Sequence, residues 1–137
     1  KYGQELEPAK LWGKSPKVFA ALALLYGALD RKSSPIEPEL RSLITVRVSQ
    51  INWCAFCVDI NSMIVLKRGS SKAKLNELER FEASELFSVR EKAALHYAEV
   101  VTLSNKQVSS DDRERLQEFF SEDQVIELTA LISFQNM

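Results

Sequence analysis

Apolar residues recur at three- and four-residue steps along most of the chain, which is the period of amphipathic helices. No segment shows the sustained alternation of a β-strand, and Gly and Pro number only four each. The pattern predicts an all-α, single-domain helical bundle over residues 15–137, preceded by an extended arm over residues 1–14. We expect the helices of this domain to begin near Ser15, Pro38, Cys54, Ser70 or Ser71, Ser88, Ser109 and Ser121.

Several predicted helix ends carry residues with a defined capping chemistry. Ser15 followed by Pro16 is typical of a helix start, and Gly69 is typical of a helix end. Ser88 and Ser121 are each followed three residues later by Glu or Gln, which is the spacing of a capping box. These signals locate helix ends independently of the apolar period.

The only two cysteines, Cys54 and Cys57, are separated by two residues and lie at the predicted start of a helix. This spacing allows a tight disulfide or the binding of one metal ion. Structural zinc is disfavoured because it needs about four ligands, and His96 is the only histidine. Inert packing as small apolar side chains is a second alternative. A helix N-terminus lowers the pKa of a thiol, so the position favours a third reading, a redox-active dithiol/disulfide pair.

Charge and hydropathy exclude two classes of partner. Eighteen Lys and Arg residues face nineteen Asp and Glu residues, so nothing indicates a nucleic-acid partner. The longest apolar stretch, residues 18–29, is interrupted by Tyr26 and Gly27 and is too short to span a membrane. We therefore expect no membrane partner. We also expect no bound cofactor and, as the default, a cytoplasmic location.

A family resemblance is carried first by residues 43–57, LITVRVSQINWCAFC. This segment resembles the signature helix pair of the alkylhydroperoxidase D-like proteins of the carboxymuconolactone decarboxylase superfamily. Residues 90–95, 108–109 and 127–132 match the same pattern in order, so the resemblance runs from about Pro38 onward. It implies a helical bundle that forms homo-oligomers. It also implies hydroperoxide reduction by the cysteine pair, with the disulfide re-reduced by a dithiol partner of the lipoyl type or a thioredoxin-like protein.

The resemblance places the family's two redox cysteines at Cys54 and Cys57. In the family mechanism the second cysteine attacks the peroxide and the first resolves the sulfenic acid, which assigns attack to Cys57. The helix N-terminus instead favours Cys54 as the attacking thiol in exchange with a disulfide. The sequence leaves both assignments open.

Two positions differ from the family pattern. Asn61 stands four residues after the second cysteine, where the family has a His, and Ser42 stands twelve residues before the first, where it has a Glu. Asn cannot titrate near neutral pH. General acid–base assistance contributes about 10²- to 10⁴-fold in rate, so we expect a slow peroxidase at best. Trp53, where the family often has Gly, narrows the approach to the cysteines.

Other charged residues could replace the missing pair only in part. Glu39 could reach the site through water, and Arg47, about two turns before the pair, could stabilise a thiolate. Their ordinary roles are a solvated acid in a first helical turn and a surface or interface cation. Asp59 points elsewhere on its helix and would raise the pKa of a nearby thiol. His96 is expected to be a packed or partly exposed helix residue rather than a base.

The sequence supports one main hypothesis and two alternatives. The main hypothesis is a thiol-dependent oxidoreductase that reduces hydroperoxides or disulfides, with Cys57, Cys54, Asn61 and Ser42 as the candidate site. The first alternative is a member that has lost catalysis and serves as an oligomeric binding scaffold, which Asn61 and Ser42 favour. Lactone decarboxylation ranks last, because that chemistry does not use two cysteines at this spacing.

Overall fold

The computed structural model describes residues 7–137, and these residues form helices and no strands, which confirms the all-α prediction. The chain divides into two compact units, Lys1–Ser33 and Ser34–Met137. The helices are α1 (Glu7–Gly13), α2 (Pro16–Leu29), α3 (Pro38–Ile51), α4 (Ala55–Lys67), α5 (Lys72–Asn76), the 3₁₀ turn η1 (Leu78–Arg80), α6 (Val89–Thr102), α7 (Ser110–Gln117) and α8 (Glu122–Asn136).

The first unit contains α1 and α2, and it corrects two expectations. The predicted extended arm is wrong over Glu7–Gly13, which is helical. That segment is rich in good helix formers, and Pro8 lies in the first turn, where its missing N–H is not needed. Residues 1–6 of the predicted arm lie outside the described residues. Ser15 precedes α2 but makes no capping hydrogen bond through its side chain.

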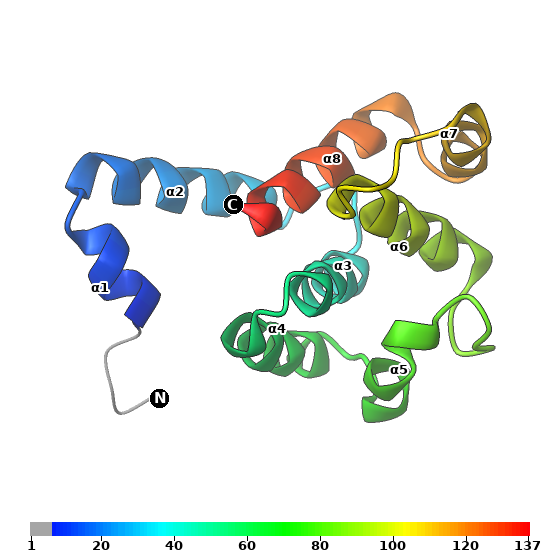
Figure 1. Ribbon diagram of the computed structural model, residues 1–137, viewed down its shortest axis with the longest axis horizontal. Coiled ribbons are helices and arrows are strands. Elements are labelled where there is room, and N and C mark those ends of the chain that lie inside the picture. The colour runs from blue at the N-terminus through cyan, green and yellow to red at the C-terminus, as the bar shows by residue number, and fades with distance from the viewer. Residues whose placement is uncertain (1–6) are drawn as a thin grey trace. The chain divides into compact units, whose positions relative to one another are not determined.

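The second unit is built around α3, which packs against α4, α6 and α8. Figure 1 shows α3 between α4 on one side and α6 and α8 on the other. Because α3 has neighbours on several sides, most of its apolar side chains are buried. The fully buried side chains at this centre come from α3, α4, α6 and α8 and include Leu43, Ile44, Val48, Val65, Leu95, Leu128 and Ile132.

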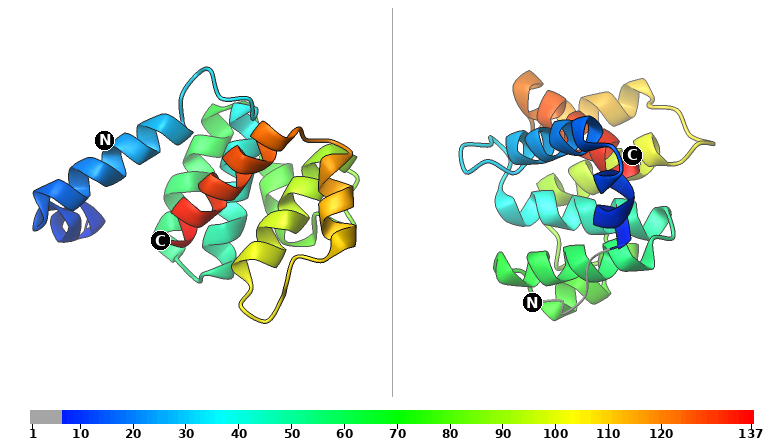
Figure 2. Two further views of the ribbon diagram at one scale, coloured as in Figure 1. Left: turned by 90° about the horizontal axis from the view of Figure 1, so that it is seen from above. Right: turned by 90° about the vertical axis from the view of Figure 1, so that its left-hand side faces the viewer.

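The helices α3 and α4 form an antiparallel pair, visible side by side in Figure 2. The pair ends at Gly69, which has a φ of 100°. The Gly69 N–H donates to Leu66 O at 3.4 Å and the Ser70 N–H donates to Val65 O at 3.3 Å. These two bonds form the Schellman motif, which confirms Gly69 as the predicted C-terminal cap.

Serine side chains cap the later helices. Ser88 and Ser121 form the predicted capping boxes at α6 and α8, and Ser109 forms a third with Asp112 at α7. Ser71 caps α5. That helix ends at Asn76 and is followed by η1, so two short elements stand where the apolar period predicts a single helix. Within the described residues, no helix is both long enough and apolar enough to cross a bilayer.

Candidate functional site

The turn between α3 and α4 is a second Schellman motif with tryptophan at its left-handed position. The Trp53 N–H donates to Gln50 O at 3.1 Å, and the Cys54 N–H donates to Ser49 O at 3.1 Å. Trp53 has a φ of 55°, a conformation that glycine adopts without strain. For a bulky residue it costs about 1–2 kcal/mol. The family resemblance implies a Gly at this position, and the left-handed conformation that the motif requires gives a physical reason for it.

The side chain of Trp53 receives no compensating burial. It is 93% exposed, the most exposed large hydrophobic side chain among the described residues. A strained backbone that presents an exposed indole next to a cysteine pair is a feature that packing alone does not explain, and such strain clusters at functional sites.

Cys54 and Cys57 are joined by a disulfide, with an S–S distance of 2.11 Å and a Cα–Cα distance of 5.2 Å. Cys54 is the N-cap residue of α4, and its Sγ accepts a hydrogen bond from the Cys57 N–H at 3.3 Å. This confirms the predicted position at a helix start. Both residues are half-buried, so the sulfurs are not sealed in the core.

The local electrostatics favour a thiolate at Cys54 when the pair is reduced. The free N–H groups and the positive end of the helix dipole lie at the N-cap, and the first turn of α4 contains no acidic residue. The Cys57 N–H that reaches Cys54 Sγ would donate to a thiolate there. Both effects lower the pKa of a thiol at this position.

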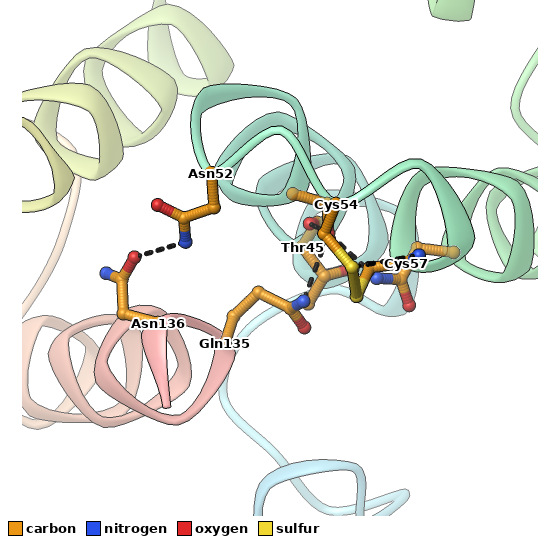
Figure 3. Close-up of a disulfide and its surroundings, with 8 residues drawn as sticks. Thr45, Asn52, Cys54, Cys57, Gln135 and Asn136 are labelled. Carbon is orange, nitrogen blue, oxygen red and sulfur yellow. Dashed lines mark hydrogen bonds between the residues drawn. A yellow bond between two sulfur atoms is a disulfide. The ribbon is translucent and has the colours of Figure 1, made fainter. Parts of the chain in front are cut away.

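Asn61 belongs to a hydrogen-bond network centred on the buried Ser49. The Ser49 Oγ donates to the Thr45 carbonyl at 2.6 Å and accepts from Asn61 Nδ2 at 3.2 Å and from Gln135 Nε2 at 3.0 Å. Figure 3 shows Gln135 reaching from α8 toward the turn that carries the disulfide. This hydroxyl uses its donor and both acceptor sites, so its hydrogen-bonding capacity is filled. No member of it titrates near neutral pH.

A second amide chain fixes the end of α8 to the same turn. The Asn52 Nδ2 donates to Asn136 Oδ1 at 2.8 Å, and Asn136 Nδ2 donates to Thr102 Oγ1 at 3.2 Å. Figure 3 shows Asn52 and Asn136 facing each other. Gln135 and Asn136 are functional-site neighbours that sequence reasoning missed. The sequence feature that could have indicated them is the pair of consecutive amide side chains at the end of an otherwise apolar helical pattern.

Ser42 lies nearer the N-terminus of α3 than Ser49 does, and it does not join the network of Asn61. Its Oγ donates to Pro38 O at 3.0 Å and accepts from Arg68 Nη1 at 2.9 Å. Seven residues of helix separate it from Ser49, which is a distance of about 10 Å. The family's glutamate position is therefore occupied here by a short hydroxyl bound to an arginine.

Arg47 and Glu39, two of the other charged candidates, are bound to partners of their own. Arg47 pairs with Glu99 of α6, its Nη2 lying 2.5 Å from Oε1, and both side chains are 16% exposed. Glu39 lies 3.3 Å from Lys74 Nζ. Both charges are therefore neutralised by structural ion pairs rather than directed at the cysteines.

His96 ties α6 to α7. Its Nε2 lies 2.7 Å from Asp112 Oδ1, and its Nδ1 lies 3.4 Å from Glu82 Oε1. Hydrogen bonds from the Ser109 hydroxyl and N–H and the contact with His96 lower the pKa of Asp112 to about 2. His96 is thus a partly exposed helix residue held by carboxylates, as the sequence predicts.

A shallow hollow of about 300 Å³ lies beside the first turn of α4, and its lining includes Trp53, Asp59 and Glu79. A neighbouring hollow of about 320 Å³ shares Trp53, Glu79 and Gln50 with it. No group of three or more His, Cys, Asp or Glu side chains among the described residues could hold a metal ion.

Comparison with known proteins gives the family. The sequence model of the carboxymuconolactone decarboxylase family matches residues 16–100. The uncharacterized protein YnjA of Escherichia coli is 41% identical over 136 residues, which cover 99% of this chain and 75% of that protein.

Solved structures agree. A protein of unknown function from Agrobacterium tumefaciens, suggested to be the antioxidant defence protein AhpD, superposes with a TM-score of 0.85 at 30% identity, over 96% of this chain and 87% of its own. A peroxidase-related protein from Silicibacter sp. TM1040 has a TM-score of 0.86 at 21% identity, over 99% of this chain and 72% of its own, and this likeness concerns the fold alone. The chain belongs to the carboxymuconolactone decarboxylase family, as an alkylhydroperoxidase D-like member of that superfamily.

Proposed function

We propose that this protein is a thiol-dependent oxidoreductase that cycles Cys54 and Cys57 between dithiol and disulfide. The observation that carries the proposal is the position of the pair: Cys54 caps α4, its sulfur accepts the Cys57 N–H, and the two sulfurs are within bonding distance. A thiolate is stabilised there, and its resolving partner is already in place.

With a disulfide substrate the reaction balances without further groups. The Cys54 thiolate attacks one sulfur of the substrate, a mixed disulfide forms, and the first substrate thiolate leaves. The Cys57 thiolate then attacks Cys54 Sγ, which forms the observed disulfide and releases the second substrate thiolate. The protein loses two electrons, the substrate gains them, and the two cysteine protons pass to the released thiolates.

With a hydroperoxide as substrate, the same cysteine pair lacks a nearby acid that could protonate the leaving oxygen. Attack by a thiolate on the peroxide yields a sulfenic acid and an alcohol or water, so the departing oxygen needs a proton. The pKa of water, the conjugate acid of hydroxide, lies far above the value of about 8.5 for a thiol, so hydroxide is the poorer leaving group. Asn61 and Ser49 cannot supply a proton in the way that an acid can. The site therefore favours disulfide exchange, with hydroperoxide reduction as a slower reaction.

One solved structure of similar sequence supports this chemistry. The Agrobacterium tumefaciens protein, 30% identical to this chain, is suggested to be an antioxidant defence protein, which supports a peroxide-related role for this chain. We propose hydroperoxides and disulfides as oxidants, a lipoyl-type or thioredoxin-like dithiol as reductant, and a homo-oligomer as the working form. The competing proposal is a scaffold without catalysis, which the positions of Asn61 and Ser42 favour.

The test is oxidation of the reduced wild-type protein. Bis(2-hydroxyethyl) disulfide and cumene hydroperoxide are each added, and loss of free thiols is followed by acid quench and mass spectrometry. Each rate is divided by that of dithiothreitol at equal thiolate concentration. We expect acceleration over this reference with the disulfide, little acceleration with the hydroperoxide, and a Cys54–Cys57 disulfide in both cases. Thiols that stay reduced with both oxidants would favour the scaffold.

A further inference from the structure

The two hollows beside Trp53 share part of their lining, and we call the surface that they make together the Trp53 groove. It is defined by the residues that both hollows share, Gln50, Trp53 and Glu79, and it extends along α4 to Asp59 and along α3 to Arg47. Ala55 and Val58, the residues that follow the two cysteines, line the same surface. The groove therefore includes residues adjacent in sequence to both cysteines, although neither cysteine is part of its lining, and it lies within the unit Ser34–Met137.

The groove carries unneutralised negative charge. Asp59 and Glu79 are exposed and form no ion pair within the described part of the chain. The one guanidinium in the lining belongs to Arg47, which Glu99 already neutralises. Three carboxylates thus face one cation, and the balance attracts a positively charged group.

Trp53 supplies the second element of a cation site. The face of an indole attracts an ammonium or guanidinium group more strongly than the other aromatic rings do. The side chain is 93% exposed and is held above the turn by a backbone conformation that glycine would adopt with less strain. Glycine would complete the same turn without presenting a ring, so the indole itself is the feature to explain.

We propose that the Trp53 groove binds the ammonium group of a small cationic disulfide whose sulfurs exchange with Cys54 and Cys57. This inference rests on the proposed function and names its substrate class. A hollow of about 300 Å³ matches one short arm of such a molecule rather than a large ligand. The ammonium lies against the indole and the carboxylates of Asp59 and Glu79, and the disulfide lies toward α4.

The chemistry is the exchange already described, with a charged substrate. Cystamine, a disulfide with an ammonium on each arm, receives two electrons from the protein dithiol and leaves as two molecules of cysteamine. The protein forms the Cys54–Cys57 disulfide, and the two cysteine protons end on the cysteamine thiolates. The groove changes the rate through binding and contributes no bond to the reaction.

The kinetic test compares three disulfides of different charge with the reduced protein: cystamine, neutral bis(2-hydroxyethyl) disulfide and anionic 3,3′-dithiodipropionate. For the protein, the rate with cystamine is divided by the rate with the neutral disulfide. This ratio is then divided by the same ratio measured with dithiothreitol, which removes differences in intrinsic reactivity, and we call the result the normalised preference. We expect a normalised preference of about fivefold for cystamine in the wild type. The anionic disulfide should react more slowly than the neutral one after the same normalisation.

The variants are chosen so that misfolding cannot explain the result. Trp53→Gly removes the indole and relieves the left-handed strain, so we expect this variant to unfold at a temperature no lower than that of the wild type. Its normalised preference for cystamine should fall toward one. Glu79→Gln should reduce the preference by about half or more. Glu85→Gln makes the same charge change at an exposed site outside the groove lining and should keep it. A preference unchanged in Trp53→Gly and Glu79→Gln would overturn the proposal.

A binding measurement separates this proposal from the proposed function. The oxidised protein has no thiol to exchange, so cystamine can bind to it only non-covalently. In a Trp12→Phe background, Trp53 is the sole tryptophan and its fluorescence reports occupancy. Saturable binding of cystamine without exchange in the reduced protein would refute the oxidoreductase and support the groove. Exchange without charge preference and without binding would support the oxidoreductase and refute the groove.

Discussion

Serine in place of either cysteine is expected to reduce catalytic turnover with disulfides or hydroperoxides to the rate measured without protein. The disulfide that closes the cycle needs both sulfurs, and no third cysteine exists to replace one. Serine is itself a preferred N-cap residue, so Cys54→Ser should keep α4 intact. Turnover is measured as thiol release from bis(2-hydroxyethyl) disulfide with dithiothreitol as reductant.

The two variants should fail at different steps, which assigns the roles. If Cys54 is the attacking thiol in disulfide exchange, Cys57→Ser accumulates a mixed disulfide at residue 54 within the time of a wild-type turnover. Cys54→Ser should form its mixed disulfide much more slowly, because Cys57 is not the N-cap. Mass spectrometry of the quenched variants reads the adducts directly. Full turnover by either single variant would contradict the paired mechanism, and Ala83→Ser, at an exposed position outside the groove lining, serves as a control.

Histidine in place of Asn61 is expected to accelerate hydroperoxide reduction by about tenfold or more, as part of the 10²- to 10⁴-fold that acid–base assistance provides. Residue 61 lies one turn after Cys57 on α4, close enough to exchange a proton with that thiol or with the leaving oxygen. The imidazole titrates near neutral pH, and the asparagine amide does not. Exchange with disulfides, whose leaving group needs no proton, should change little.

The control for this gain is Asn61→Gln, which keeps an amide and does not titrate. Both variants disturb the bond from residue 61 to Ser49, so they share any structural effect. The measurement is the rate of oxidation of the reduced protein by cumene hydroperoxide between pH 5 and pH 9. An equal rate in the His and Gln variants across this range would show that the missing acid is not what limits the peroxide reaction.

The sequence predicted the parts of this structure that depend on local chemistry. The capping boxes at Ser88 and Ser121, the Gly69 terminus and the cysteines at a helix start all follow from short-range rules, and all are confirmed. The extended arm is wrong over Glu7–Gly13, because a proline in the first turn of a helix does not interrupt it.

The parts that the sequence could not supply depend on tertiary contacts. Gln135 meets Ser49 across 86 positions, and only the packing of α8 against α3 brings them together. The pairing of Arg47 with Glu99 likewise needs α6 beside α3. The left-handed conformation of Trp53 could not be predicted because a tryptophan does not indicate such a turn. It becomes evident only from the two Schellman hydrogen bonds in the structure.

The thiol pKa values of the reduced wild-type protein test the central claim most directly. Alkylation rates are measured from pH 4 to pH 10, and mass spectrometry of peptides locates each adduct at Cys54 or Cys57. We predict that the pKa of Cys54 lies clearly below the value of about 8.5 for a free thiol, because the N-terminus of α4 stabilises its thiolate. Values near 8.5 for both cysteines would contradict the redox account and leave the pair a structural link in a helical scaffold.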